Sequence, residues 1–444
     1  MDLCTPDRFR RPSGTLCAEA RLSRDVLPAP QEDVGGSPLS GTAQVGGGPL
    51  NTIVYFDHTA LMSGGEIALL HLLRHIDTDR YRPIVVLSEE GPLHAKLVEA
   101  GVETHILLLD ETVGDTRKDS LNLRSLLKPR AVFSVLRYAC RLARFLKTHK
   151  AQLLHTNSLK ADVIGGIAGR LARVPVIWHL RDRIATDYLP AAAVTGFRWL
   201  ARLLPTCILA NSQATLLALE PRATQNRAIV KAGPLRTTLQ VVHDGIPTEE
   251  MTEVSSALAA GPRIGLVGRL SPWKGQHIFL EAAAVVHQQF PEAHFQIIGS
   301  AMFGEEEYEA KVREQCKTLG LSDCVEFTGF RKDVPALIGQ LDVLVHASTL
   351  GEPFGQVVVE GMIAGKPVVA TNGGGVPEIV QDGITGWLVP MGESAPMAEA
   401  IVKLLEDPER AEKMGAEGRQ RVKDHFSIAL TARRVEAVYD QMLP

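Results

Sequence analysis

The chain has 444 residues, of which 45% are hydrophobic and 22% are charged, and its formal net charge is −4. This length exceeds one ordinary hydrophobic core, so we expect two or three domains of a globular protein. The small negative charge argues against nucleic acid as a main partner.

The six cysteines are scattered without a C-x-x-C pair or a metal-type spacing, which favours a reducing compartment over a disulfide framework. No apolar run reaches the roughly 18–20 residues that a membrane-spanning helix needs. The N-terminus carries arginines and no long apolar region, unlike a signal peptide. We therefore expect a cytoplasmic protein.

Residues 1–50 are rich in Pro, Gly, Ser and Ala and lack periodicity, so we predict a disordered tail or translation begun upstream of the true start. Short apolar runs then alternate with helical patterns, beginning with a Gly64-Gly65 turn before a helix at 66–73. This alternation predicts a parallel sheet with helices on both faces. The strand-like runs of this part are 52–56, 82–87, 151–155, 174–178 and 206–210.

The alternation breaks near residue 243, and we predict a linker over 244–261 between domains at 51–243 and 262–426. A last helical pattern, within 427–444, can pack on either domain, including back on the N-terminal one. The fold class is α/β, with two doubly wound Rossmann-like domains facing across a cleft at the carboxyl ends of their strands. The second set of strand-like runs is 263–267, 294–298, 324–328, 341–346, 366–370 and 386–389.

Glu352 and Glu360 lie eight positions apart around a Pro-Phe-Gly turn. We expect Glu352 in the loop after the strand at 341–346, and Glu360 about one turn or more into the next helix. The backbone N–H groups of Gly355 and Gln356 would be free donors at that helix start, which suits an anion. The carboxylates suit hydroxyl groups, and a sugar linked to a nucleoside diphosphate carries both kinds of group.

Two cations, Arg269 and Lys274, follow the strand at 263–267, directly after Gly268. Fixed cations stabilise the charge that develops on a diphosphate leaving group, and they can replace a divalent metal. The alternative is a solvated loop with two surface charges. Ser300 ends the next strand and could line a nucleotide pocket, and a second glycine-rich turn occupies 373–375.

His179 and Asp182 fall at the carboxyl end of a strand of the first domain. A histidine there could touch a transferred sugar or an acceptor hydroxyl, or it could be a hydrogen-bonded structural residue. His155 and Asn157 occupy a similar strand end. For His346 we expect packing near the Glu352 loop.

The segment 117–150 is basic and carries apolar residues at helical spacing. Such a helix can lie on an anionic membrane surface, or its apolar stripe can pack on the sheet with the charges in solvent. Both interpretations stay open.

The order of four motifs resembles the retaining GT-B glycosyltransferases of family 4, the glycosyl transferases group 1. The resemblance covers nearly all of 52–444. The motifs are Gly-Arg-Leu-x-x-x-Lys-Gly at 268–275, Glu-x7-Glu at 352–360, Gly-Gly-x-x-Glu at 374–378 and Asp-Gly-x-Thr-Gly at 382–386.

On the donor side, this resemblance implies that Arg269 and Lys274 bind the donor diphosphate. Glu360 would bind the ribose hydroxyls and Glu352 the sugar hydroxyls. The backbone of 354–356 (Phe354, Gly355 and Gln356) would lie beside the sugar and the pyrophosphate.

On the other side, the resemblance places His179 near the transferred sugar and makes Gly64 and Gly65 the glycine loop of the first domain. It implies transfer to a hydroxyl of a glycan, a lipid-linked or a small-molecule acceptor, without cofactor or metal, in polysaccharide or glycolipid synthesis. Membrane contact through 117–150 would serve a lipid-linked acceptor. The alternatives are a sugar-nucleotide epimerase and a non-catalytic binding protein.

The sequence departs from the family pattern in three places, of which the first is that residues 1–50 match nothing in the pattern. His243-Asp244-Gly245 stands where an Asn-Gly pair is common. The run 357–359 consists of three valines, which are poor helix formers, so packing must enforce a helix there.

Overall fold

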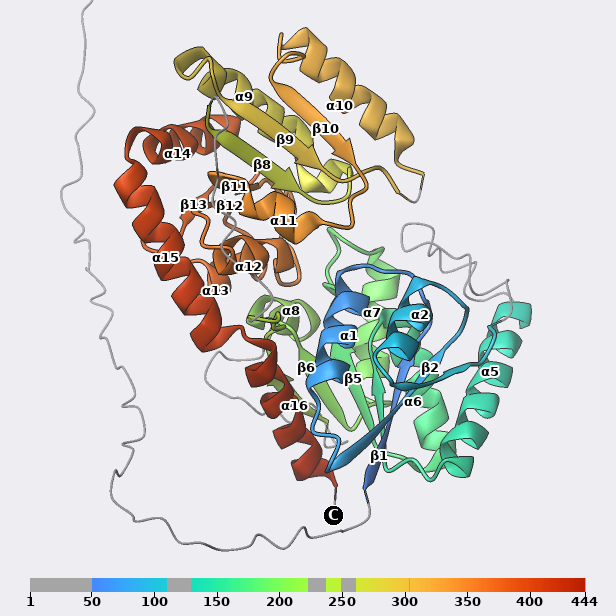
Figure 1. Ribbon diagram of the computed structural model, residues 1–444. Helices are drawn as coiled ribbons and strands as arrows, with labels where there is room; N and C mark the ends of the chain where they lie inside the picture. Colours follow the sequence, from blue (N-terminus) through green and yellow to red (C-terminus); the bar gives the residue numbers. More distant parts are fainter. Residues whose placement is uncertain (1–49, 110–128, 223–236, 249–260, 303, 444) are drawn as a thin grey trace, which may run out of the picture. The chain divides into compact units, whose positions relative to one another are not determined.

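The computed structural model describes residues 50–109, 129–222, 237–248, 261–302 and 304–443 (Figure 1). Its strands form two sheets in which every pairing is parallel, with helices between consecutive strands. The predicted fold class is confirmed. Residues 1–49 and 249–260 lie outside the described residues, so the disordered tail and the linker boundaries stay predictions.

The first sheet has seven strands in the order β3-β2-β1-β4-β5-β6-β7. The order reverses between β1 and β4, and ligands of doubly wound sheets bind outside the carboxyl ends at such a point. The strands are β1 (Asn51–Asp57), β2 (Tyr81–Leu87), β3 (Glu103–Ile106), β4 (Leu153–Thr156), β5 (Val176–Leu180), β6 (Cys207–Ala210) and β7 (Thr238–Val241). The helices are α1 (Gly64–His75), α2 (Pro92–Glu99), α5 (Pro129–Thr148), α6 (Leu159–Ala172), α7 (Ala191–Ala201) and α8 (Gln213–Leu219).

The second sheet has six strands in the order β10-β9-β8-β11-β12-β13, with its reversal between β8 and β11. The strands are β8 (Arg263–Val267), β9 (His294–Ile298), β10 (Val325–Gly329), β11 (Val343–His346), β12 (Val368–Thr371) and β13 (Trp387–Val389). The helices are α9 (Gln276–Gln289), α10 (Glu306–Thr318), α11 (Val334–Gly339), α12 (Gln356–Ile363), α13 (Val376–Ile379), α14 (Ser394–Glu406), α15 (Pro408–His425) and α16 (Ile428–Met442).

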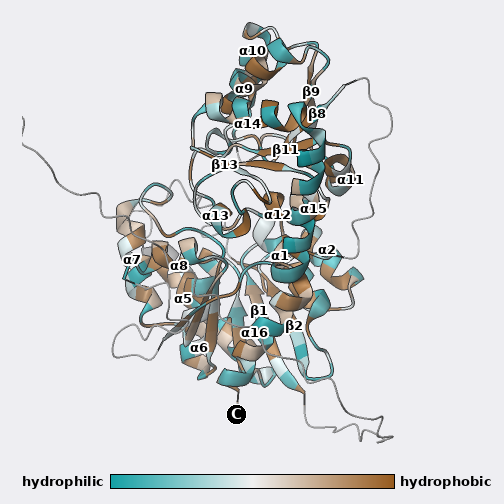
Figure 2. Cartoon of the chain, turned by 90° about the vertical axis from the view of Figure 1, so that its left-hand side faces the viewer, coloured by the Kyte–Doolittle hydropathy of each residue, from teal (hydrophilic) through white to brown (hydrophobic). Residues whose placement is uncertain are grey.

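The hydrophobic cores lie on the faces of the two sheets. Figure 2 shows that the strands are mostly hydrophobic, whereas α15 is mostly hydrophilic. In β1 the side chains alternate between faces: Val54 and Phe56 join one core, while Ile53 and Tyr55 join the other. The second of these cores includes Val435 and Tyr439 of α16. The last helix of the chain therefore packs on the first sheet, and it contacts α1.

Two local predictions need correction. Gly64 and Gly65 do not form a turn before α1 but are its first residues, because the backbone N–H of Ser63 bonds the Glu66 carboxylate at 3.1 Å and starts the helix earlier. The strand expected at 174–178 lies two residues later, because β5 pairs with β6 through Leu180, so His179 is its next-to-last residue and lies at the carboxyl end of the strand as expected.

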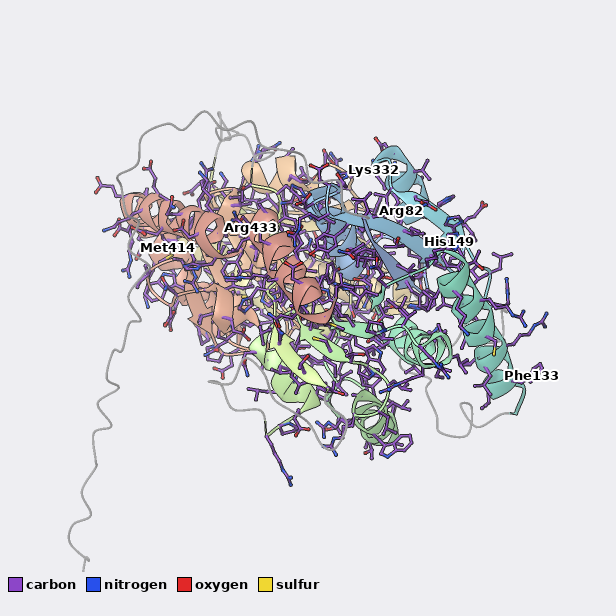
Figure 3. All side chains as sticks on the ribbon, turned by 90° about the horizontal axis from the view of Figure 1, so that it is seen from below. Arg82, Phe133, His149, Lys332, Met414 and Arg433 are labelled. Carbon is purple, nitrogen blue, oxygen red and sulfur yellow. The ribbon has the colours of Figure 1, made fainter. Side chains whose placement is uncertain are left out.

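The basic helix α5 packs mainly through its apolar stripe. Tyr138, Leu142 and Leu146 are buried in a core of the first sheet. Val132 and Phe133 near its start are exposed, and Figure 3 shows Phe133 at the outer side of this helix. Residues 117–128 of the basic segment lie outside the described residues. None of the helices in the described ranges is long and apolar enough to cross a membrane.

Candidate active site

The second sheet brings Lys274 and Glu352 together at the reversal of its strand order. The segment after β8 carries Gly268, Arg269 and Lys274, and the segment after β11 carries Glu352. Lys274 Nζ lies 2.6 Å from Glu352 Oε1. Two motifs that are 78 residues apart in the chain therefore meet in one ion pair.

Glu352 is buried and held by three donors. Besides Lys274, Ser348 Oγ donates to Oε1 at 2.6 Å and His346 Nε2 donates at 2.9 Å. Burial alone would raise the pKa of Glu352, but the charge of Lys274 and the contact with His346 hold that pKa well below its ordinary value. The carboxylate is thus ionised and fixed in place.

The backbone fixes Lys274 as well. Residues Pro272–Lys274 form a single 3-10 turn, and Trp273 accepts a hydrogen bond from the Thr349 N–H at 2.8 Å. Lys274 Nζ also lies 4.4 Å from the centre of the Trp273 ring. Gly275 ends the turn at φ +72° and presses against the backbone of Ala347, which follows β11.

Arg269 and Gly268 lie beside this turn. Arg269 Nε is 3.3 Å from Glu305 Oε2, so each of the two predicted cations has a carboxylate partner. A Cβ built on Gly268 would lie 3.7 Å from Lys274 Cδ, and the Leu270 N–H bonds the Ser300 carbonyl at 3.0 Å. The structure thus gathers Ser300, Gly268 and Lys274 at adjacent strand ends.

The helix α12 begins at Gln356, directly after Gly355 at φ +117°. Phe354, Val358 and Val359 are buried in one core, so packing does enforce a helix over the three valines. A Cβ built on Gly64 would lie 3.4 Å from Gln356 Oε1. The glycines that begin α1 and the start of α12 are therefore neighbours.

Glu360 lies five residues into α12 and is half-buried. Burial raises its pKa to about 7, although a hydrogen bond from Gln356 and the charge of Lys274 oppose the shift. Glu352 and Glu360 therefore differ in protonation near neutral pH, where Glu360 is about half protonated.

In the first sheet, the strand ends form a second polar group. Arg181 pairs with the carboxylate of Asp244, and its Nε donates to Asn157 Oδ1 at 2.9 Å. Asn157 in turn donates to Asp57 at 2.8 Å. His155 Nε2 lies 3.0 Å from His179 Nδ1, whereas Asp182 accepts from the Tyr188 hydroxyl at 3.0 Å. His155 is thus hydrogen-bonded to His179, and Asn157 is hydrogen-bonded to Arg181.

Hydrogen bonds also join the loops of the two sheets. Arg183 donates to the Gly351 carbonyl at 2.9 Å. The Glu378 carboxylate accepts the first backbone N–H groups of α8, from Gln213 at 2.8 Å and Ala214 at 2.9 Å. It also accepts from His243 Nε2 at 2.9 Å.

Sequence reasoning missed Arg181, Arg183 and the bonding of Glu378. Arg181 bonds Asn157 and Arg183 bonds Gly351, 24 and 168 residues away in the chain, so no local pattern marked either arginine. For Glu378, the Gly-Gly-x-x-Glu motif was a usable signal, but its partners on α8 are about 165 residues away in the chain.

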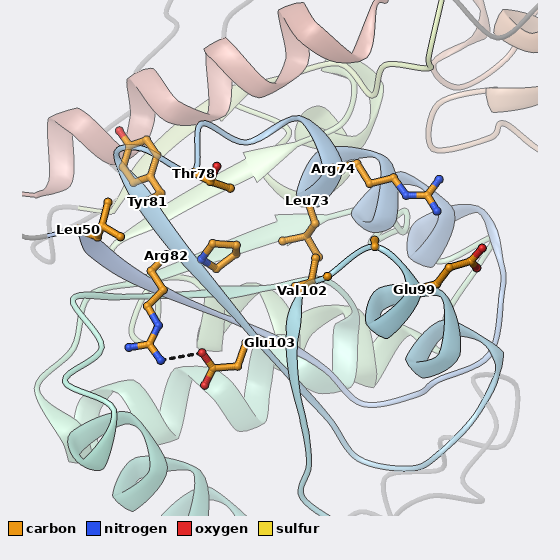
Figure 4. A pocket seen from close by; sticks show the side chains of 12 residues that line it. Leu50, Leu73, Arg74, Thr78, Tyr81, Arg82, Glu99, Val102 and Glu103 are labelled. Carbon is orange, nitrogen blue, oxygen red and sulfur yellow. Dashed lines mark hydrogen bonds and ion pairs between the residues drawn. The ribbon is translucent and has the colours of Figure 1, made fainter. Parts of the chain in front are cut away.

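A separate group of side chains near β3, an edge strand of the first sheet, has residue types that bind metal ions. Glu103, His105 and His149 could hold a metal ion, among the residues that the structure describes. Glu103 starts β3, at the amino end of that strand, and pairs with Arg82 at 2.7 Å beside an open pocket of about 670 Å³ (Figure 4). This group is distinct from the carboxyl-end site.

Two family descriptions match the chain. Residues 249–421 match glycosyl transferases group 1, and residues 63–224 match a glycosyl transferase 4-like domain. Spore coat protein SA of Bacillus subtilis is 35% identical over 180 residues, which cover 39% of this chain and 48% of that protein. A 2-deoxystreptamine glucosyltransferase of Streptomyces kanamyceticus is 29% identical over 307 residues, covering 64% of this chain and 75% of that protein.

Solved structures extend the match to both sheets. The crystal structure of Anabaena Alr3699/HepE in complex with UDP and glucose superposes with a TM-score of 0.73 at 27% identity, covering 87% of this chain and 99% of that chain. The chain spans about half the length of several curated relatives that it matches. The two family matches together take in most of the chain, which therefore consists of a glycosyl transferase 4-like domain followed by a glycosyl transferases group 1 domain in a GT-B fold.

Proposed function

We propose that the protein is a retaining, metal-independent glycosyltransferase that moves a sugar from a nucleotide-diphosphate sugar to a hydroxyl group. The observation that carries this proposal is the Lys274–Glu352 pair at 2.6 Å, which puts a cation and a buried carboxylate in one place. The relative Alr3699/HepE, whose structure holds UDP and glucose, supports a nucleotide-sugar donor.

In this proposal Arg269 and Lys274 stabilise the negative charge that grows on the diphosphate as the glycosidic bond breaks. The acceptor hydroxyl attacks the anomeric carbon from the leaving-group side, and a donor phosphate oxygen takes its proton. Glu352 positions the sugar. It is a poor nucleophile, because three donors already occupy its Oε1 oxygen.

The acceptor is a glycan, a lipid-linked sugar or a small molecule. We propose that the protein works in the cytoplasm, with contact to the membrane surface through α5. The exposed apolar residues Val132, Phe133 and Leu136 of that helix, next to exposed Arg137 and Arg144, support this contact.

A panel of nucleotide-sugars in a thermal-shift assay tests the donor. The correct donor at 100 times its Kd should add about 2.7 kcal/mol to the stability, and the bare nucleotide should stabilise as well. No stabilisation by any nucleotide-sugar would contradict the proposal. The stabilising donor is then incubated with acceptors, and the anomeric configuration of the product is read by NMR. Conversion of the donor sugar without an acceptor would instead identify an epimerase.

Donor affinity should depend on pH through Glu360. Ribose hydroxyls donate to an ionised carboxylate, so binding favours the deprotonated form and must weaken as pH falls through about 7, the pKa of this group. Calorimetric titration of the nucleotide at pH 6 and 8.5 should show the wild type binding about tenfold more tightly than Glu360→Gln at pH 8.5, but only about twofold more tightly at pH 6. The ratio of the two affinities at each pH is unaffected by titration of the nucleotide itself, because that titration changes both affinities equally. A ratio that stays constant would remove Glu360 from the ribose site.

A further inference from the structure

Four buried polar side chains form a row that runs from the last helix of the chain to His179. Tyr55 of β1, His155 of β4, His179 of β5 and Tyr439 of α16 are each 0% exposed. The Tyr55 and Tyr439 hydroxyls are 2.8 Å apart, Tyr439 Oη is 2.6 Å from His155 Nδ1, and His155 Nε2 is 3.0 Å from His179 Nδ1. Every link is within hydrogen-bond distance.

Arg181 indicates the direction of these bonds. Its guanidinium can only donate, and its NH2 group lies 3.4 Å from His179 Nδ1, so this ring nitrogen is an acceptor. His155 Nε2 must therefore carry a proton and donate to it. Burial and the charge of Arg181 lower the pKa of His155 to about 3, so the ring is neutral and its Nδ1 accepts from Tyr439. Tyr439 Oη then accepts from Tyr55.

The protonation of His179 Nε2, the last atom of the row, follows from the same argument. Burial and the neighbouring charge of Arg181 also hold the pKa of His179 well below its ordinary value, so this ring is neutral. With Nδ1 accepting, its proton sits on Nε2. That buried atom has no hydrogen-bond partner among the described residues. An unmet buried N–H carries the cost of its lost hydration, which an oxygen acceptor would remove.

We propose that His155 and Tyr439 are positioning residues that hold His179 as the Nε2–H tautomer, so that Nε2–H donates to an oxygen of the transferred sugar. This inference rests on the proposed function. It makes His179 a hydrogen-bond donor and not a base, because its outer nitrogen already carries the proton. Since His179 is fully buried, neighbouring side chains must move for the sugar to reach it.

Nuclear magnetic resonance of the full chain with ¹⁵N-labelled histidine tests the tautomer without any need for turnover. Two-bond ¹H–¹⁵N correlations distinguish the Nε2–H from the Nδ1–H form, and a His179→Gln variant assigns the signal. We expect the Nε2–H form in the wild type. We also expect the Nε2 signal to move when the stabilising nucleotide-sugar is added, but not with the bare nucleotide. An Nδ1–H form in the wild type would overturn the proposal.

Two phenylalanine variants then separate positioning from structure. Tyr439→Phe removes the donor to His155, so that only the long Arg181 contact of 3.4 Å still favours the Nε2–H form. We expect a mixture of His179 tautomers, with kcat/KM about tenfold lower and nucleotide affinity unchanged. Tyr55→Phe is the matched control: it removes an equal hydroxyl from the same row but leaves the Tyr439 donor in place, so the tautomer and kcat/KM should stay as in the wild type.

The outcomes separate this inference from the proposed function. The Nε2–H form in a protein that transfers no sugar would refute the transferase proposal and leave the fixed tautomer standing. Active enzyme whose tautomer and kcat/KM are the same in Tyr439→Phe as in the wild type would refute the positioning role alone.

Discussion

Replacement of Lys274 by methionine is expected to lower turnover by about 10²- to 10³-fold, a loss typical of removing one preorganised group that stabilises developing charge. Methionine keeps an unbranched apolar chain against Trp273 while the cation is lost. Glu352 keeps His346 and Ser348 as donors, so the fold should persist. Steady-state kinetics with the identified donor, beside a thermal melt, measures both quantities.

Lys311→Met is the matched control for this change. Lys311 is an exposed residue of α10 that pairs with Glu307 one helical turn away, and its loss should leave turnover unchanged. If Lys274→Met transferred sugar at the wild-type rate, the assignment of the leaving-group site would be wrong.

Replacement of Gly275 by alanine is expected to destabilise the protein by about 3 kcal/mol or more and to impair catalysis with it. Gly275 has φ +72°, where an L-residue costs roughly 1–2 kcal/mol, and a Cβ would overlap the Ala347 carbonyl, which adds the cost of overpacking. The backbone contact that sets the Lys274 turn against β11 would have to open.

The Gly320→Ala variant separates the cost of the steric contact with Ala347 from the cost of the left-handed backbone conformation. Gly320 has almost the same φ, +71°, but a Cβ there meets nothing within 4 Å. Urea unfolding of both variants should show a small loss for Gly320→Ala and a loss larger by at least about 1 kcal/mol for Gly275→Ala. Equal losses would mean that backbone strain alone accounts for the effect.

The sequence was most informative where a motif follows a strand. Parallel strands end at one edge, so the loops carrying Lys274 and Glu352 were expected to meet, and they form an ion pair. The roles of these residues stay predictions. Two edge strands of the first sheet were missed: β3 (Glu-Thr-His-Ile) and β7 (Thr-Leu-Gln-Val) mix polar and apolar residues and lack the apolar run of the inner strands. Bonds such as His155 to Tyr439 span 284 residues, and no local pattern encodes them.

The return of α16 to the first sheet has a consequence for biosynthesis. The last strand of that sheet ends at Val241, yet Ile53 and Tyr55 are covered in part by Val435 and Tyr439. At a synthesis rate of 5–20 residues per second, roughly 10–40 seconds separate these two points. During that interval α1 and α2 cover only part of this face of the nascent first sheet. The uncovered apolar part is a surface that a chaperone can recognise, and folding of the sheet can finish only after the second sheet has been made.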